Sequence, residues 1–77
     1  MDKKNLVGDR VREARKNAKP PITQSDLVAR LQTQGMKIDQ SGVSKIEAGL
    51  RPVLDTEVVA LARALKVSVV WLLEEDN

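Results

Sequence analysis

Two stretches decide the fold: Thr23-Gln24-Ser25-Asp26-Leu27, and Asp39-Gln40-Ser41-Gly42-Val43-Ser44-Lys45-Ile46-Glu47-Ala48-Gly49. They predict two short helices in succession, each with its own start signal. The Thr23 hydroxyl can accept a hydrogen bond from the backbone N–H three residues on, and Asp26 stands where a capping box has its acid. Asp39 is the expected cap of the second helix, and Gly49 ends it, because glycine is common just past a helix end. We therefore expect helices over about 24–34 and 40–48.

The second of these helices has an outward face of hydrogen-bonding residues, whereas its apolar side consists of Val43 and Ile46. The outward residues are Gln40, Ser41, Ser44 and Lys45. Glutamine can pair with the N6/N7 edge of adenine, lysine with O6/N7 of guanine, and serine with several edges. Gly42 costs about 1 kcal/mol in a helix relative to alanine, and its missing side chain would let this face lie close to another surface. The face is therefore a candidate for contacts with DNA bases, and a solvated helix face is the open alternative.

The composition excludes several classes of function. The 77 residues include no cysteine and no histidine, so disulfides, thiolate metal sites and histidine-based acid–base catalysis are excluded. The N-terminus is too polar for a signal peptide, and no apolar run approaches a membrane span. Paired acids, a nucleophile with its base and a phosphate-binding loop are also missing from the sequence. We expect one domain over residues 1–77, cytoplasmic, not an enzyme, and without a metal, a cofactor, a membrane partner or an evident small-molecule ligand.

Three further helices are predicted, over about 3–18, 56–65 and 69–74, and no strand pattern competes with them. The first has Val7, Val11, Ala14 and Ala18 on one face, and Pro20-Pro21 stops it. Asp55 and Ser68 are the expected caps of the other two. The fold class is therefore all-α, a compact bundle of five short helices.

Apolar pairs at hydrophobic-staple spacing accompany four of the expected helix starts. The pairs are Ile22 with Leu27, Ile38 with Val43, Leu54 with Val59, and Val67 with Leu72. Val58, Leu61, Ala62 and Leu65 form the expected buried stripe of the fourth helix. These starts agree with one another, so the predicted order of helices rests on several independent signals.

Charge is distributed unevenly along the chain. The net charge is +2, with seven Lys/Arg against three Asp/Glu in residues 1–19 and two against five in residues 52–77. Such asymmetry permits nucleic-acid contact on one face of the protein. Most of the basic side chains in the first helix are expected to be solvated, with Arg10 and the end of the helix as candidates for approaching phosphates.

With these residues in place, the chain resembles a helix-turn-helix domain of the lambda-repressor-like family, the phage repressor and Cro type, also called the xenobiotic-response-element family. The matching pieces are Val11-Arg12-Glu13-Ala14-Arg15, residues 23–27, residues 43–49, Arg51-Pro52, residues 61–68 and Trp71-Leu72-Leu73. The similarity extends from about Leu6 to Leu73. Two features depart from the short members of the family: the link between the second and third helices is longer, as in one subtype, and Ala48 replaces a frequent asparagine.

The resemblance implies roles for individual residues. It implies phosphate contacts for Gln24, in the first turn of its helix, and for Arg51; Arg10 and Lys37 are added as candidates. Arg15 and Glu47 resemble a structural salt bridge between the first and third helices. The candidate dimer patch is Val69, Val70 and Trp71, with Trp71 either a core residue or an interface anchor.

The function that these observations predict is sequence-specific binding to double-stranded DNA by a transcriptional regulator of prokaryotic or phage origin, associated with the nucleoid. We expect a repressor that acts as a homodimer on a near-palindromic operator with half-sites about 10 bp apart, or a multiple of that. A protein-interaction module or antitoxin-like partner, which keeps the fold with little direct contact to bases, is the alternative.

Overall fold

A computed structural model describes residues 3–74, which form five helices. They are α1 (Gly8–Asn17), α2 (Gln24–Thr33), α3 (Gln40–Glu47), α4 (Asp55–Leu65) and α5 (Val69–Leu73). No strand occurs in this part of the chain, so the predicted all-α class is confirmed. Among residues 3–74, no helix has the length and apolar character that crossing a membrane would need.

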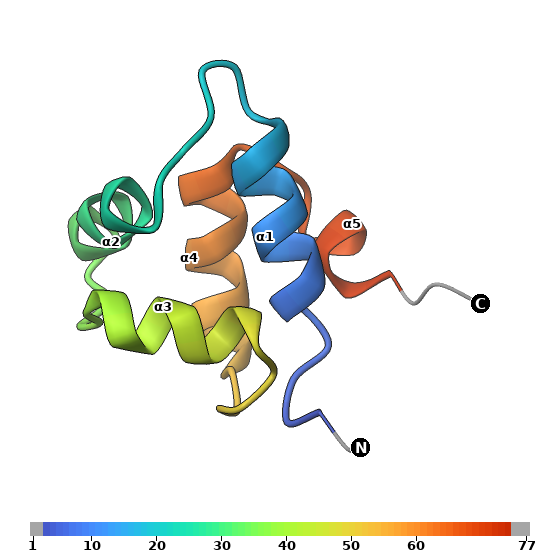
Figure 1. The fold of residues 1–77 in the computed structure, drawn as a ribbon. Coiled ribbons are helices and arrows are strands. Elements are labelled where there is room, and N and C mark those ends of the chain that lie inside the picture. Colours follow the sequence, from blue (N-terminus) through green and yellow to red (C-terminus); the bar gives the residue numbers. More distant parts are fainter. Residues whose placement is uncertain (1–2, 75–77) are drawn as a thin grey trace.

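One hydrophobic core holds the five helices together. Helices α1 and α4 run through the middle of the bundle, α2 and α3 lie on one side of them, and α5 lies on the other (Figure 1). Each helix contributes at least one side chain with no exposed surface: Val11, Leu27, Leu31, Ile46, Leu61 and Leu72. The predicted stripe of α4 is buried as expected.

Three of the four predicted helix caps are confirmed. Asp26 N donates to Thr23 Oγ1 at 3.0 Å and Thr23 N donates to Asp26 Oδ2 at 3.2 Å, which completes the capping box of α2. Gly42 N donates to Asp39 Oδ1 at 2.8 Å at the start of α3. Trp71 N donates to the Ser68 hydroxyl at 3.0 Å at the start of α5. These local hydrogen bonds satisfy backbone donors that would otherwise lack partners at a helix start.

The prediction that Asp55 caps α4 is wrong. Leu54 is the N-cap residue, and Asp55 is already the first residue of the helix. Glu57 supplies the missing partner, because its Oε1 accepts a hydrogen bond from Leu54 N at 3.0 Å. The staple expected between Leu54 and Val59 is also not buried, since Leu54 is 64% exposed and Val59 is exposed as well.

Helix α1 begins at Gly8, about five residues later than predicted, and Asn5 is the reason. The Asn5 side-chain oxygen accepts hydrogen bonds from Val7 N at 3.1 Å and from Gly8 N at 2.8 Å. Its amide group donates to the carbonyls of Ile46 at 3.2 Å and Arg51 at 2.8 Å. Val7 is the N-cap residue of α1, and Asn5 accepts hydrogen bonds from the backbone at this helix start while it also joins the segment before α1 to the end of α3.

Candidate nucleic-acid interface

Helix α3 presents the predicted polar face to solvent. Gln40, Ser41, Ser44 and Lys45 are all exposed. Val43 and Ile46 point the other way and are buried in the core. Four hydrogen-bonding side chains from two successive turns therefore share one accessible surface, which is the arrangement that a helix in the major groove requires.

Gly42 does not belong to this exposed face. It is buried, and a Cβ atom added there would lie 2.5 Å from Ile38 Cγ1 and 3.2 Å from Arg51 Nη1. The prediction that Gly42 lets the outer face approach another surface is therefore wrong. The glycine instead makes room for the protein's own side chains behind α3.

A paired Arg15 and Glu47 join α1 to the end of α3. Arg15 Nε donates to Glu47 Oε2 at 2.8 Å and Arg15 Nη2 donates to Glu47 Oε1 at 2.9 Å, so the pair is bidentate. The side chains are only 13% and 6% exposed. The hydrogen bonds from the guanidinium to Glu47 raise the pKa of Arg15. This is the geometry that the resemblance implied for these two residues, and it fixes α3 against the scaffold.

Gln24 extends this pair to the exposed face of α3. Its Nε2 donates to Glu47 Oε1 at 3.2 Å, and Gln40 Nε2 donates to Gln24 Oε1 at 3.5 Å. Gln24 is the first residue of α2, where the backbone N–H groups of the helix start carry positive partial charge. A continuous row of side chains thus runs from α1 through the end of α3 and the start of α2 to Gln40.

A family model described as helix-turn-helix matches residues 11–72. The chain belongs to the helix-turn-helix family, of the Cro/C1 type. The family is one of DNA-binding transcription regulators, and the matched range includes all of α2 and α3. No match was found among curated proteins or among solved structures.

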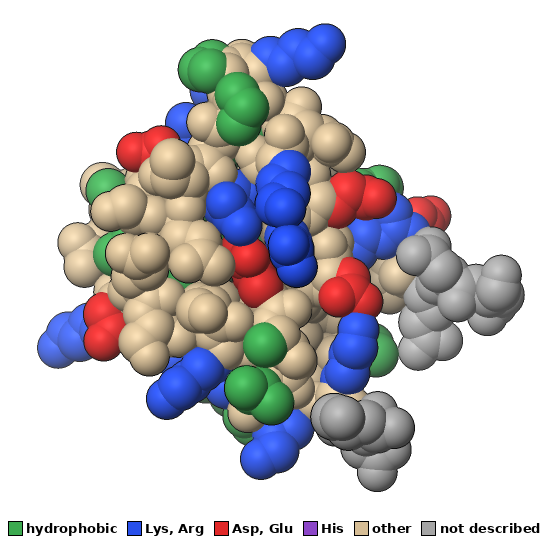
Figure 2. Space-filling view, viewed as in Figure 1, with side chains coloured by type: hydrophobic (Ala, Val, Ile, Leu, Met, Phe, Trp, Pro, Cys, Tyr) green, Lys and Arg blue, Asp and Glu red, His purple; other side chains and the backbone are tan. Residues whose placement is uncertain are grey.

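In this helix-turn-helix protein, α1 contributes two basic residues beside α3: Arg12, which the sequence analysis did not single out, and Lys16, which lies at the end of the helix that it did. A hollow of about 390 Å³ is lined by Arg12, Arg15, Lys16, Gln24, Ser44, Glu47 and Ala48. Figure 2 shows Lys and Arg side chains gathered in the middle of this face, with an acidic side chain beside them. Arg12 and Lys16 are exposed and four residues apart, so they share one side of α1. That spacing was visible in the sequence, but nothing in the sequence showed that this side of α1 lies next to α3.

Two of the residues expected at phosphates have partners inside the protein. Arg10 lies over the Trp71 ring, 4.8 Å from its centroid, and forms ion pairs with Glu13 at 3.3 Å and Glu74 at 3.5 Å. The contacts with Trp71 and Glu74 place Arg10 near α5, which lies on the side of α1 away from α3 (Figure 1). Arg51 Nη2 lies 3.3 Å from Glu57 Oε2. Neither Arg10 nor Arg51 lines the hollow that Arg12, Lys16 and Gln24 share.

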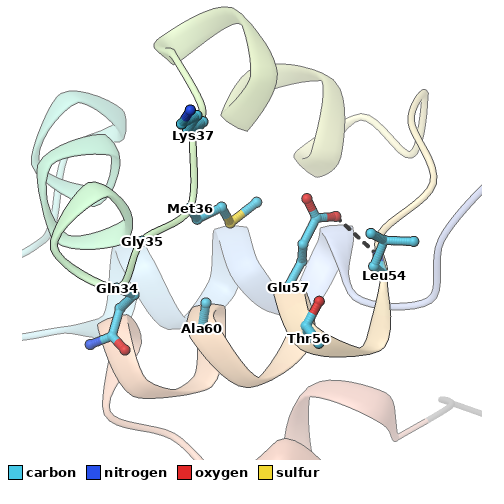
Figure 3. Close-up of a pocket in the computed structure, with 8 residues that line it drawn as sticks. All are labelled: Gln34, Gly35, Met36, Lys37, Leu54, Thr56, Glu57 and Ala60. Carbon is cyan, nitrogen blue, oxygen red and sulfur yellow. Dashed lines mark hydrogen bonds between the residues drawn. The ribbon is translucent and has the colours of Figure 1, made fainter.

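Lys37 lies in the link between α2 and α3, which is longer than a tight turn but anchored in the core. Met36 and Ile38 on either side of it are buried, whereas Lys37 is exposed. Gln32 Nε2 also donates to the Ile38 carbonyl at 3.3 Å. Met36 points into a hollow of about 350 Å³ between this link and α4, toward Glu57 (Figure 3). The buried neighbours fix the direction of α3 relative to α2, which the length of the link alone does not determine.

The candidate dimer patch is only partly exposed. Val70 is 74% exposed, but Val69 and Trp71 are half-buried, and Arg10 covers one face of the Trp71 ring. An apolar hollow of about 350 Å³ lies next to the patch, lined by Val53, Asp55, Val58, Val59, Val69 and Leu73. The apolar surface at this end of the protein is therefore a groove between α4 and α5, with Val70 beside it.

Proposed function

We propose that this protein is a transcriptional regulator that binds specific double-stranded DNA sites, with α3 in the major groove. Gln40, Ser41, Ser44 and Lys45 would contact base edges. The observation that supports this most is the row of side chains from Arg15 through Glu47 and Gln24 to Gln40. The last contact in this row, from Gln40 to Gln24 at 3.5 Å, joins the first exposed amide of α3 to the start of α2, and ordering that amide before DNA binds would lower the entropy lost on binding.

Phosphate contacts would come from the elements on either side of α3. Gln24 stands at the start of α2, where backbone N–H groups and the helix dipole favour an anion. Arg12 and Lys16 line the hollow between α1 and α3, and each is exposed. Lys37 is exposed just before α3. Such contacts fix the position of the protein on the duplex, and α3 then selects the sequence.

We further propose that the protein acts as a dimer through the groove between α4 and α5. A single copy offers few phosphate contacts, so two copies on a near-palindromic site would bind far more tightly than one. Val59, Val70 and Leu73 are the exposed apolar side chains at this end, and Val69 lies partly buried among them. A bound dimer would occupy its site against other proteins, which makes repression the activity we favour.

The same groove also supports the second candidate function, a protein-interaction module with little direct contact to bases. Selection of sites from random DNA, followed by binding measurements over a range of salt concentrations, separates the two functions. Specific retention well above random DNA supports the regulator. Uniform weak binding that salt abolishes supports the interaction module, because such binding is electrostatic and independent of sequence.

Two single variants then test the assignment of residues on the selected site. Lys45→Ala should relax the preference at one base position by about 1–3 kcal/mol while the fold is unchanged. Gln24→Ala should weaken binding to all sequences, because a phosphate contact carries no base information, and should also reduce the preference at the base that Gln40 contacts, because Gln40 donates to Gln24. An unchanged sequence preference would remove Lys45 from the recognition surface, and a loss at one base alone would contradict the phosphate role of Gln24.

A further inference from the structure

Helix α3 is fixed to the rest of the protein near both of its ends, by different elements. Its last turn is held by the Arg15–Glu47 pair and by Asn5, and it passes so close to α1 that a Cβ on Gly8 would lie 2.3 Å from the Ile46 carbonyl oxygen. None of these contacts reaches the first turn of α3, which carries Gln40 and Ser41. The first turn has a separate contact behind it, made by Arg51.

Arg51 lies four residues after α3 and folds back beneath the start of that helix. A Gly42 Cβ would lie 2.5 Å from Ile38 Cγ1 and 3.2 Å from Arg51 Nη1, so Ile38 and the guanidinium together occupy the space behind the first turn of α3. Its Nη2 lies 3.3 Å from Glu57 Oε2. About a third of the Arg51 side chain is exposed, and less of the Glu57 side chain. The guanidinium is thus placed between the first turn of α3 and the first turn of α4.

Glu57 is a rigid anchor for this guanidinium. Its second oxygen, Oε1, accepts the hydrogen bond from Leu54 N at 3.0 Å that begins α4, as the dashed line in Figure 3 shows. Its carboxylate also lies in the first turn of α4, where the helix dipole stabilises negative charge. Arg51 would have to give up a fixed anionic partner, and its place beside Gly42, to reach a phosphate.

We propose that Arg51 is a positioning residue for base recognition and not a phosphate ligand. Because its guanidinium lies beside Gly42, Arg51 fixes the position and direction of the first turn of α3. It thereby determines where Gln40 and Ser41 contact the bases. Glu57 acts with it, because the carboxylate fixes the guanidinium. This inference rests on the proposed function, since it assigns Arg51 a part in the same recognition surface.

The salt dependence of binding separates the two roles of Arg51. Each phosphate contact contributes about 0.9 to the slope of log K against log salt, so a lost phosphate contact is visible in that slope. On a site selected from random DNA, Arg51→Ala should leave the slope unchanged and reduce the base preference at the positions that Gln40 and Ser41 contact, by about two- to fivefold. Glu57→Gln should produce the same change in base preference. Arg12→Ala is the matched control. It should make the slope less steep by about 0.9 and weaken binding to all sequences equally.

The opposite pattern overturns the proposal. If Arg51→Ala makes the slope less steep by about 0.9 and leaves the base preference unchanged, Arg51 contacts a phosphate. Arg51→Lys serves where the alanine variant does not fold: lysine keeps the charge but not the planar fork. A positioning role predicts that the lysine variant loses base preference, and a phosphate role predicts that it keeps both preference and slope.

A measurement without DNA tests the contact between Arg51 and the first turn of α3 separately from the proposed function. Amide hydrogen exchange at Val43 and Ser44 should become faster in Arg51→Lys and in Glu57→Gln, whereas exchange at Ala48, at the other end of α3, should not change. Equal exchange at Val43 and Ser44 in the wild type and both variants would contradict the positioning role. If the wild type selects no DNA sequence, the proposed function fails, and the exchange rates still decide whether Arg51 holds the first turn.

Discussion

The strongest test of the scaffold behind α3 is the substitution Glu47→Gln, which removes one charge and leaves the shape of the side chain. Glu47 is 6% exposed and accepts three hydrogen bonds: from Arg15 Nε at 2.8 Å, from Arg15 Nη2 at 2.9 Å and from Gln24 Nε2 at 3.2 Å. An amide offers one acceptor oxygen in place of two. In place of Oε2 its NH2 group would face Arg15 Nε, and in place of Oε1 it would face both Arg15 Nη2 and Gln24 Nε2, so at least one of the three hydrogen bonds would be lost.

The expected cost follows from these contacts. A hydrogen bond to a charged group contributes about 1.5–3 kcal/mol, and breaking a fully buried ion pair by removing one partner costs about 3–5 kcal/mol. Arg15 keeps some contact with water, at 13% exposure, so the cost should lie toward the lower of these ranges. We expect a loss of about 2–3 kcal/mol in the free energy of unfolding. For a domain of this size, 1 kcal/mol shifts Tm by about 4–8 °C, so Tm should fall by roughly 10–20 °C.

Urea denaturation of Glu47→Gln, Arg15→Met and the double variant measures this cost and the coupling between the two residues. The coupling energy should be about 2 kcal/mol, since the side chains are in direct contact. Asp9→Asn is the matched control, because its pair with Lys3 is exposed on both sides, and it should cost less than about 0.5 kcal/mol. A cost for Glu47→Gln as small as that of the control, or additive single variants, would refute the reasoning.

Three shorter predictions test the other parts of the structure. Gly8→Ala should destabilise the protein by about 1–3 kcal/mol in urea, because its Cβ would lie 2.3 Å from the Ile46 carbonyl oxygen; an unchanged midpoint would contradict this close approach. The hydrogen bonds from Thr23 lower the pKa of Asp26 below its ordinary value of 3.8, so the stability that they give is present above that pH and is lost as the pH falls through the folded-state pKa. Denaturation between pH 5 and pH 2.5 should therefore show a smaller acid loss for Asp26→Asn than for the wild type, and equal losses would contradict the capping box as its source. Leu73→Asp should shift the proposed dimer to monomer in sedimentation, and a monomeric wild type would remove the dimer from the proposed function.

Helix starts were predictable where the signal lies within a few residues, and not where it depends on distant parts of the chain. The caps at Thr23, Asp39 and Ser68 each bond to a backbone N–H three residues away, so the sequence alone contains both partners. Asn5 also accepts a local hydrogen bond, from Gly8 N, but its amide group donates to carbonyls 41 and 46 residues away. These two distant hydrogen bonds hold the segment before α1 in a non-helical conformation. At α4 the expected cap was Asp55, but the hydrogen bond from Leu54 N to Glu57, three residues later, places the N-cap at Leu54.

The exposed polar face of α3 was predictable in its residues but not in the contacts that support it. The helical period that places Val43 and Ile46 in the core also places Gly42 beside Ile46, four residues away, so the burial of Gly42 was available from the sequence. The contact between Gln24 and Gln40 was not, because it depends on the path of the link between α2 and α3. Buried Met36 and Ile38 determine that path, and no local rule predicts the conformation of such a link.

The structure divides six of the basic residues into two groups, and the division has a measurable consequence. Arg10, Arg15 and Arg51 are paired with acids of the protein itself. Within residues 3–74, Arg12, Lys16 and Lys37 have no ion pair and are exposed. If only the second group neutralises phosphates, each copy should contribute about −2.7 to the slope of log K against log salt, and a dimer should show a slope of about −5. A slope near −10 would mean that the paired arginines leave their carboxylates when DNA binds. In that case the arginines of these ion pairs would bind phosphates instead of their carboxylates. The contacts that hold α3 in place would then have to break as the complex forms.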